Sequence, residues 1–180
     1  MRIFVGIDIP KEIKTQLDIE ADKFLKYASD SRKMSTDNYH LTLKFIGEID
    51  VAQIDELDRL LKESLKDVEA FDVHLKDLGY FKKKDGLILW MGVLQGVGAL
   101  KKIHLTIDPL LSDKFNLEKS VFSPHVTLAK KVVVEHEDIL RKNKTKDYMF
   151  KVSEVIIFYS HIVEDVLTYT PLSSIKLLER

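Results

Sequence analysis

Hydrophobic residues alternate with polar ones in some segments of the chain and recur every three or four positions in others. Alternation gives a β-strand one apolar face, whereas the longer spacing gives a helix one apolar face. The alternating segments predict strands over residues 3–9, 38–45, 71–78, 86–93, 125–132, 149–159 and 167–177. The longer spacing predicts helices over residues 11–28, 51–65, 97–111 and 135–144.

The order of these predicted elements repeats in the two halves of the chain. Each half has the order strand, helix, strand, helix, strand, strand, if the strand over 86–93 both closes the first half and opens the second. We therefore predict an α+β fold in which residues 1–180 form a single two-lobed domain. Two largely antiparallel sheets flanked by helices would surround a central cleft. Pro109 lies inside one predicted helix and is expected to kink or interrupt it.

A short His-x-Thr pattern occurs in the second strand of each half. In the strand over 38–45, alternation assigns a polar face to His40, Thr42 and Lys44. The opposite, apolar face is assigned to Leu41, Leu43 and Phe45. The strand over 125–132 repeats the pattern with His125 and Thr127. A third match, His104 with Thr106, falls in a predicted helix, where residues two apart point about 200° away from each other, so we do not expect it to form a site.

Two histidines and two threonines on facing strands suit acid and base catalysis at a phosphate. A neutral imidazole can accept a proton from water while a protonated one gives a proton to the leaving oxygen. The hydroxyls of Thr42 and Thr127 can donate hydrogen bonds to phosphate oxygens, and Lys44 and Lys130 could add positive charge. The residues alone do not decide which histidine is the acid. The alternative interpretation is a polar strand face without catalytic chemistry.

The composition narrows the classes of protein. The 28 basic and 29 acidic residues nearly cancel, so no global positive field would collect long nucleic acids. Cysteine is absent, which excludes disulfides and thiol catalysis, and the sequence has neither a signal-peptide pattern nor an apolar run long enough to span a membrane. It also lacks metal-ligand spacings and a Gly-rich phosphate loop. We therefore expect a cytoplasmic monomer without cofactor or metal.

Two further features have competing interpretations. The segment GYFKKKDG, residues 79–86, combines aromatic and basic residues that could hold single-stranded RNA, but it also has the composition of a charged hairpin turn. Trp90 is most simply a core residue.

The chain resembles the two-histidine phosphoesterases, in the branch of RNA 2′,3′-cyclic phosphodiesterases also called 2′-5′ RNA ligases. The resemblance covers nearly the whole chain and is carried by four segments: RIFVGIDIP, DNYHLTLKFIGEI, LILWMGV and FSPHVTLAK. It implies a bilobal fold with both motifs in a cleft, and opening of a terminal 2′,3′-cyclic phosphate to a 2′-phosphomonoester. By position, His40 would be the general acid and His125 the general base, with Thr42 and Thr127 holding the phosphate.

The chain departs from the family pattern at three positions. Lys33 lies in a segment where the family often has an aromatic residue and a proline, and Leu87 replaces a frequent arginine. Lys130 replaces an arginine that closes the second motif, which keeps the charge but loses bidentate phosphate binding. We expect RNA ends as partners, with an altered grip on the substrate. Another small cyclic phosphodiester as substrate, or a non-catalytic RNA-end-binding module, are the alternatives.

Overall fold

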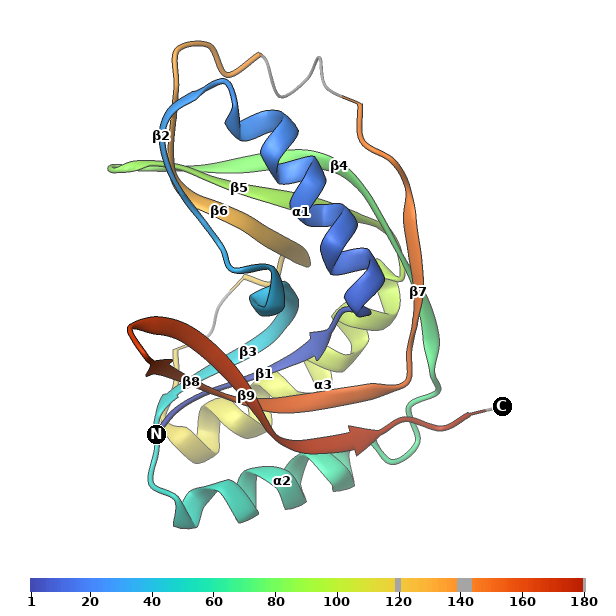
Figure 1. Ribbon diagram of the computed structural model, residues 1–180. Helices are drawn as coiled ribbons and strands as arrows, with labels where there is room; N and C mark the ends of the chain where they lie inside the picture. The colour runs from blue at the N-terminus through green and yellow to red at the C-terminus, as the bar shows by residue number, and fades with distance from the viewer. Residues whose placement is uncertain (119–120, 139–143, 180) are drawn as a thin grey trace.

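The computed structural model describes residues 1–118, 121–138 and 144–179 (Figure 1). In chain order the elements are β1 (Arg2–Asp8), α1 (Lys11–Leu25), β2 (Ala28–Lys33), η1 (Thr36–Asn38), β3 (His40–Glu48), α2 (Ala52–Leu65), β4 (Phe71–Lys83), β5 (Gly86–Gln95), α3 (Val97–Phe115), β6 (His125–Val134), β7 (Tyr148–Val152), β8 (Glu154–Val163) and β9 (Val166–Lys176). The predicted α+β class is confirmed.

The strands of the described residues form one curled sheet in the order β7-β4-β5-β6-β3-β1-β8-β9, with β2 paired to the free part of β6. All named pairs are antiparallel. The order is symmetric about the junction of β6 and β3, so β5 corresponds to β1, β4 to β8 and β7 to β9. The two sheets predicted from the sequence are therefore two halves of one sheet, called lobes below, which join at the strands that carry the His-x-Thr pattern.

The helices bury apolar faces against this sheet. In Figure 1, α1 crosses in front of the β4-β5-β6 part, while α2 and α3 lie together near β3, β1 and β9. One connected core contains fully buried leucines from all three helices, such as Leu17, Leu57 and Leu100, together with Val5 and Leu128 from the strands. A second, small cluster on the opposite face of the sheet contains Phe4, Ile156 and Phe158. That opposite face is the one that holds the histidines.

Three expectations about the elements need correction or fall outside the described residues. The strand predicted over 149–159 is two strands: β7 pairs with β4 in one lobe and β8 pairs with β1 in the other. The positions that face the main core change from even numbers in β7 (148, 150 and 152) to odd numbers in β8 (155 and 157), with Ser153 between the strands. Helix α3 continues through Pro109. The residue whose carbonyl loses its helical partner there, Leu105, is 70% exposed, so water can solvate that carbonyl.

Half of the helix predicted over 135–144 falls on residues 139–143, which lie outside the described part of the chain. Its described first residues, 135–138, are not helical. Strand β2 and the short helix η1 were not predicted, because residues 28–38 are polar and show no clear period.

Candidate active site

The two His-x-Thr patterns lie side by side at the junction of β3 and β6. Leu41 pairs with Val126, and both side chains are buried in the core. Because neighbouring residues on a strand point to opposite faces, the residues on either side of this pair share the other face. These are His40, Thr42, His125 and Thr127. The antiparallel direction sets each histidine across from the threonine of the other motif.

A β-bulge follows the pattern on both strands. On β3 the pairing with β1 skips Leu43, since Val5 pairs with Lys44 and Gly6 with Thr42. On β6 the pairing with β5 skips Leu128 in the same way. A bulge adds one residue and so exchanges the faces of the residues beyond it. The prediction that Phe45 shares the apolar core face of the strand is therefore wrong: its side chain is 63% exposed, on the face of the histidines.

The His40 ring is held by two hydrogen bonds. Its Nδ1 lies 2.7 Å from the carbonyl oxygen of Asn38, and its Nε2 lies 2.8 Å from the hydroxyl oxygen of Thr42. A carbonyl can only accept, so Nδ1 carries the proton and the neutral Nε2 accepts from the threonine hydroxyl. Asn38 is fixed in turn, because its buried side-chain amide donates to the carbonyl of Leu167 on β9.

Burial lowers the pKa of His40 to about 4, and the hydrogen bond that its ring donates to the backbone carbonyl of Asn38 offsets part of this effect. The charges of Lys14 and of a protonated His125 lower the pKa further, and Asp8 raises it. The pairing of Leu41 with Val126 puts both imidazoles on one face, so a charge on His125 disfavours a charge on His40. His40 is therefore neutral at pH 7 when no anion is bound.

His125 has a similar but more open environment. Its Nδ1 lies 2.6 Å from the carbonyl oxygen of Ser123, so this nitrogen also carries the proton. Burial lowers the pKa of His125 below its ordinary value, and the hydrogen bond to Ser123 partly opposes that shift. The unprotonated Nε2 is thus available to accept a proton at neutral pH.

Aromatic rings surround both histidines. The rings of Phe4 and Tyr169 lie 4.7 and 5.1 Å from the His40 ring, and that of Tyr169 meets it edge on. The rings of Phe81 and Trp90 lie 5.0 and 6.2 Å from the His125 ring. Such packing restricts imidazole rotation and accounts for the desolvation of both rings. Trp90, taken from the sequence as a core residue, instead borders the site.

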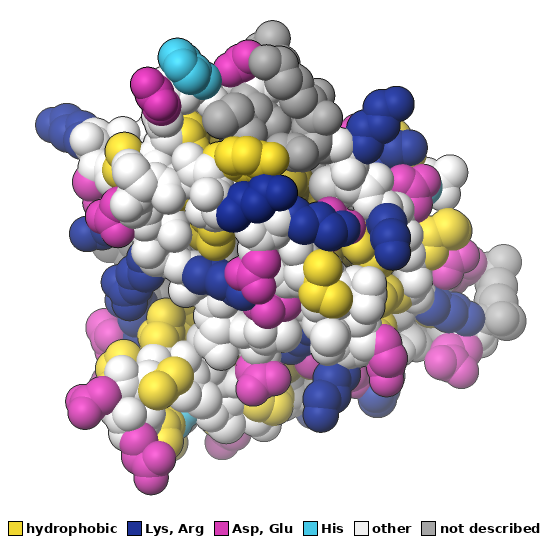
Figure 2. All heavy atoms as spheres, turned by 45° about the horizontal axis from the view of Figure 1, so that its top comes forward, with side chains coloured by type: hydrophobic (Ala, Val, Ile, Leu, Met, Phe, Trp, Pro, Cys, Tyr) yellow, Lys and Arg dark blue, Asp and Glu magenta, His cyan; other side chains and the backbone are white. Residues whose placement is uncertain are grey.

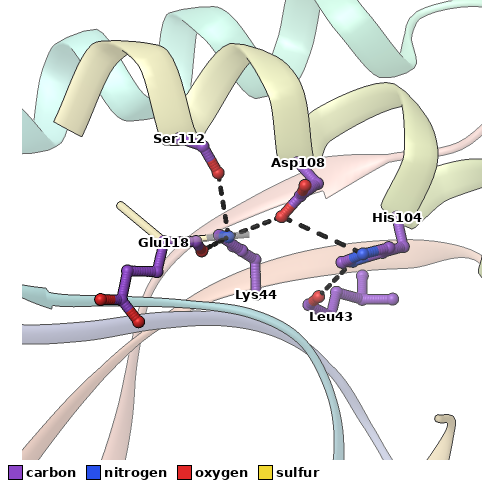
Figure 3. Close-up of polar contacts among 6 residues, drawn as sticks. All are labelled: Leu43, Lys44, His104, Asp108, Ser112 and Glu118. Carbon is purple, nitrogen blue, oxygen red and sulfur yellow. Dashed lines mark hydrogen bonds and ion pairs between the residues drawn. The ribbon is translucent and has the colours of Figure 1, made fainter. Parts of the chain in front are cut away.

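The structure does not bring Lys44 to His40 and His125: Figure 3 shows its side chain beside Asp108 and Ser112 of α3. Its side chain is 3% exposed and lies on the core face, where Nζ contacts Asp108 Oδ1 at 2.5 Å, Ser112 Oγ at 3.0 Å and the carbonyl of Glu118 at 3.2 Å. The bulge at Leu43 causes this placement, because it turns the next residue away from the threonine face. The expectation that Lys44 adds charge at a phosphate is therefore not supported.

The third His-x-Thr match behaves as its helical setting predicts. His104 is buried on α3 and its Nδ1 lies 2.9 Å from the carbonyl of Leu43, while the exposed Thr106 bonds back to the carbonyl of Lys102. His104 also stacks on Phe122, at 4.4 Å between ring centroids. It therefore supports the bulge from behind and adds no group to the histidine face.

Comparison with known proteins gives a consistent result. The family model of the 2'-5' RNA ligase superfamily matches residues 16–161. The chain belongs to this superfamily. A protein of Thermotoga maritima named RNA 2',3'-cyclic phosphodiesterase is 33% identical over 132 residues, covering 72% of this chain and 70% of the relative. One of the same name from Aquifex aeolicus is 30% identical over 155 residues, covering 82% and 81%.

A solved structure shows the same fold. The crystal structure of E. coli LigT complexed with 3'-AMP superimposes with a TM-score of 0.83 at 24% identity, covering 98% of this chain and 97% of that one. The two-histidine family predicted from the four segments is thus confirmed. The superfamily fold explains why both motifs lie at the junction of a symmetric sheet.

The three departures from the superfamily pattern occupy different environments. Leu87 is an uncharged side chain buried on β5, so no cation stands where the family often has an arginine. Lys33 forms ion pairs with Asp18 and Asp22, at 2.9 and 2.6 Å. Lys130 is exposed beyond the bulge of β6, on the same face as the histidines, and has no ion pair to any described residue. Of these three departures, Lys130 is therefore the one that brings to the site a positive charge with no ion pair among the described residues.

The basic segment 79–86 forms the end of the β4–β5 hairpin, with Lys84 and Asp85 in the turn, as one of its two interpretations required. Lys82 pairs with Glu137 at 2.9 Å, and Lys131 lies 3.5 Å from Asp85 beside the turn. In the view of Figure 2, basic and acidic side chains are interspersed over the surface. This mixture agrees with the nearly neutral net charge.

Sequence reasoning missed Phe4 and Tyr169, which pack against His40, and it considered Phe81 only as part of the basic segment 79–86. Phe4 does carry a usable signal, since it is a large apolar residue at a polar-face position of β1, between the buried Ile3 and Val5. Within the described ranges, no group of three metal-ligating side chains is assembled. The described helices include none that is long and apolar enough to cross a membrane.

Proposed function

We propose that this protein hydrolyses RNA ends that carry a 2′,3′-cyclic phosphate and releases a 2′-phosphomonoester. The observation that carries the proposal is the placement of two His-Thr pairs on one face of adjacent strands, each histidine across from the other pair's threonine. The names of the relatives from Thermotoga and Aquifex supply the substrate class. The symmetric arrangement supports a phosphate held between two imidazoles.

The proposed reaction uses one proton acceptor and one proton donor. His125 Nε2 takes a proton from water, whose oxygen attacks phosphorus and forms the new P–O bond. The P–O3′ bond breaks, and His40 Nε2 gives its proton to the leaving 3′ oxygen. The assignment of acid and base follows the family resemblance. No metal or cofactor enters the reaction.

The donor role requires that His40 be protonated when substrate is bound. Its pKa of about 4 makes it neutral in the free protein. A phosphodiester anion beside the ring favours the imidazolium and raises its pKa, because an opposite charge stabilises the charged form. Thr42 can then direct its hydroxyl to a phosphate oxygen, since a protonated Nε2 no longer accepts from it.

Thr42, Thr127 and Lys130 are proposed to hold the phosphate and stabilise the charge that accumulates on its oxygens. Lys44 is left out because its ammonium is engaged by Asp108 on the core side. Lys130 supplies one flexible cation in place of the planar guanidinium of an arginine, so its contribution is electrostatic more than directional.

The direct test is incubation of the protein with an oligonucleotide that ends in a 2′,3′-cyclic phosphate. We expect a 2′-phosphate product, turnover that a chelator does not change, and a loss of 10²–10⁴-fold in His40→Asn and in His125→Asn. His136→Asn is the matched control, since His136 is 71% exposed and remote from the pairs. A 3′-phosphate product, or inhibition by chelator, would contradict the proposed mechanism.

Two alternatives remain open to the same assay. Equal turnover of a cyclic mononucleotide and an oligonucleotide would favour a small cyclic phosphodiester as the natural substrate. Tight binding of cyclic-phosphate ends without hydrolysis would favour a binding module. A joining reaction, in which a 5′-hydroxyl replaces water, forms the O5′–P bond and breaks the P–O3′ bond to leave a 2′-5′ linkage, would be detected by supplying the cyclic-phosphate end and the 5′-hydroxyl end in excess.

A further inference from the structure

A pocket of about 420 Å³ lies beside the histidines, on the side of His40. Arg2 of β1, Arg32 of β2 and Lys130 of β6 bring three positive charges to its wall. Phe4 and Tyr169 also line it, and these are the rings that pack against His40. The pocket and the proposed catalytic face therefore share a wall.

The three cations have no counter-charge in the pocket. None of the described residues that line it is acidic, and none of the three cations has an ion pair with a described residue. Glu48 pairs with Arg2 across β1 and β3, but its carboxylate does not line the pocket. That carboxylate lies 3.5 Å from the amino group of Met1 instead. The pocket therefore differs from the β4–β5 hairpin, where Lys82 forms an ion pair with Glu137.

Like charges that converge in a partly enclosed space repel one another. Burial, and then the charges of Arg32 and Arg2, lower the pKa of Lys130. The same two arginines act on Tyr169, whose pKa is raised by burial and reduced in part by their charges. An anion that enters the pocket would relieve this repulsion, and arginine is well suited to bind phosphate oxygens in pairs.

The position of the pocket relates it to the scissile phosphate. Lys130 follows Thr127 by three residues on β6, and Phe45 follows Thr42 by three on β3, a rise of about 10 Å along each strand. Both residues lie beyond a bulge and on the histidine face. A nucleotide whose cyclic phosphate lay at the threonines could thus extend its 5′ side toward the pocket.

We propose that Arg2 and Arg32 bind the 5′-phosphoryl group of the terminal nucleotide, so that the protein selects substrates with a second phosphate, while Lys130 serves the cyclic phosphate at the threonines. This inference rests on the proposed function, which places the cyclic phosphate at the two His-Thr pairs. It makes the chain an enzyme for RNA ends rather than for cyclic mononucleosides that lack a 5′-phosphate. Phe45 forms an exposed apolar side of the same pocket.

The test compares adenosine 2′,3′-cyclic phosphate with the same compound carrying a 5′-phosphate, which differ only in that group. We expect kcat/KM to favour the 5′-phosphorylated compound by roughly tenfold to a hundredfold, and the preference to shrink with added salt, because salt screens exposed charges. In Arg2→Gln/Arg32→Gln the preference should fall to about one. Arg59→Gln is the control, since Arg59 is 68% exposed on α2 and absent from the pocket.

A binding measurement separates failure of this inference from failure of the proposed function. Calorimetry with adenosine 2′-monophosphate and adenosine 2′,5′-bisphosphate needs no turnover, and the bisphosphate should bind more tightly by the same factor. Equal affinities in the unmodified protein, or a preference retained by the double variant, would overturn the inference. Hydrolysis of neither substrate would refute the proposed function alone. If the double variant does not fold, Arg32→Gln should still lower the preference.

Discussion

Replacing Lys44 by methionine tests whether this residue serves the fold or the phosphate. The change removes an ammonium that contacts Asp108, Ser112 and the carbonyl of Glu118, and it leaves the carboxylate of Asp108, whose side chain is 11% exposed, without its cation. Breaking a buried ion pair by removing one partner costs about 3–5 kcal/mol. We expect Lys44→Met to lower the free energy of unfolding, measured with urea and circular dichroism, by that amount.

The double variant Lys44→Met/Asp108→Leu should regain most of this stability, because it removes the stranded charge as well. Lys66→Met is the matched control: Lys66 pairs with Glu63 at the surface, where an ion pair contributes at most about 1 kcal/mol. A loss below about 1 kcal/mol in Lys44→Met would refute the reasoning. Normal stability with lost turnover would instead place the ammonium at the phosphate, as simple strand alternation predicted.

Three other predictions follow from the histidines and their surroundings. The two histidines must share one proton in the active protein, and above the pKa of His125, which lies below 6.5, they hold none. The kcat/KM should therefore fall about tenfold per pH unit in that range. A flat profile from pH 6.5 to 8.5 would contradict this. The pKa of His40 is about 4 in the folded protein and 6.5 in the unfolded chain, so the unfolded chain takes up the proton first as the pH falls. The free energy of unfolding should therefore drop by about 3 kcal/mol between pH 6.5 and 4. The drop should be smaller in His40→Asn. Gly79→Ala places a methyl group 2.1 Å from the indole of Trp90, so it should lower the free energy of unfolding by about 1–3 kcal/mol and shift the tryptophan fluorescence. Gly98→Ala is the control: its methyl group meets no atom within 4 Å, and the variant should be as stable as the unmodified protein.

The sequence predicted the paired histidines and threonines because two local signals agreed. Alternation put His40 and Thr42 on one face, and the repeated order of elements put His125 and Thr127 at the equivalent place. The pairing of Leu41 with Val126 joins the two strands as this correspondence requires. Periodicity was sufficient here because the strands are regular up to the threonines.

The residues beyond the threonines could not be placed by alternation. A bulge exchanges the faces of the residues that follow it on the strand. The bulges fall at Leu43 and Leu128, which the strand pairing skips, and nothing in the sequence distinguishes these leucines from regular strand residues. The aromatic residues around the histidines come from β1, β4, β5 and β9, which a linear pattern cannot bring together. Phe81 and Trp90 reach His125 only because β4 pairs with β5, and β5 with β6, in the folded sheet.

The two bulges also relate the duplicated motif to the proposed substrate, which has no symmetry. Up to the skipped leucine the strands present the same groups, one histidine and one threonine each. Beyond it, the equivalent core positions hold Lys44 on β3 and Ala129 on β6, while the equivalent face positions hold Phe45 and Lys130. One lobe therefore offers an aromatic ring and the other a cation next to the same pocket. The symmetric part fits a phosphate with two similar proton-transfer sides, and the asymmetric part fits a nucleotide that extends from it in one direction only.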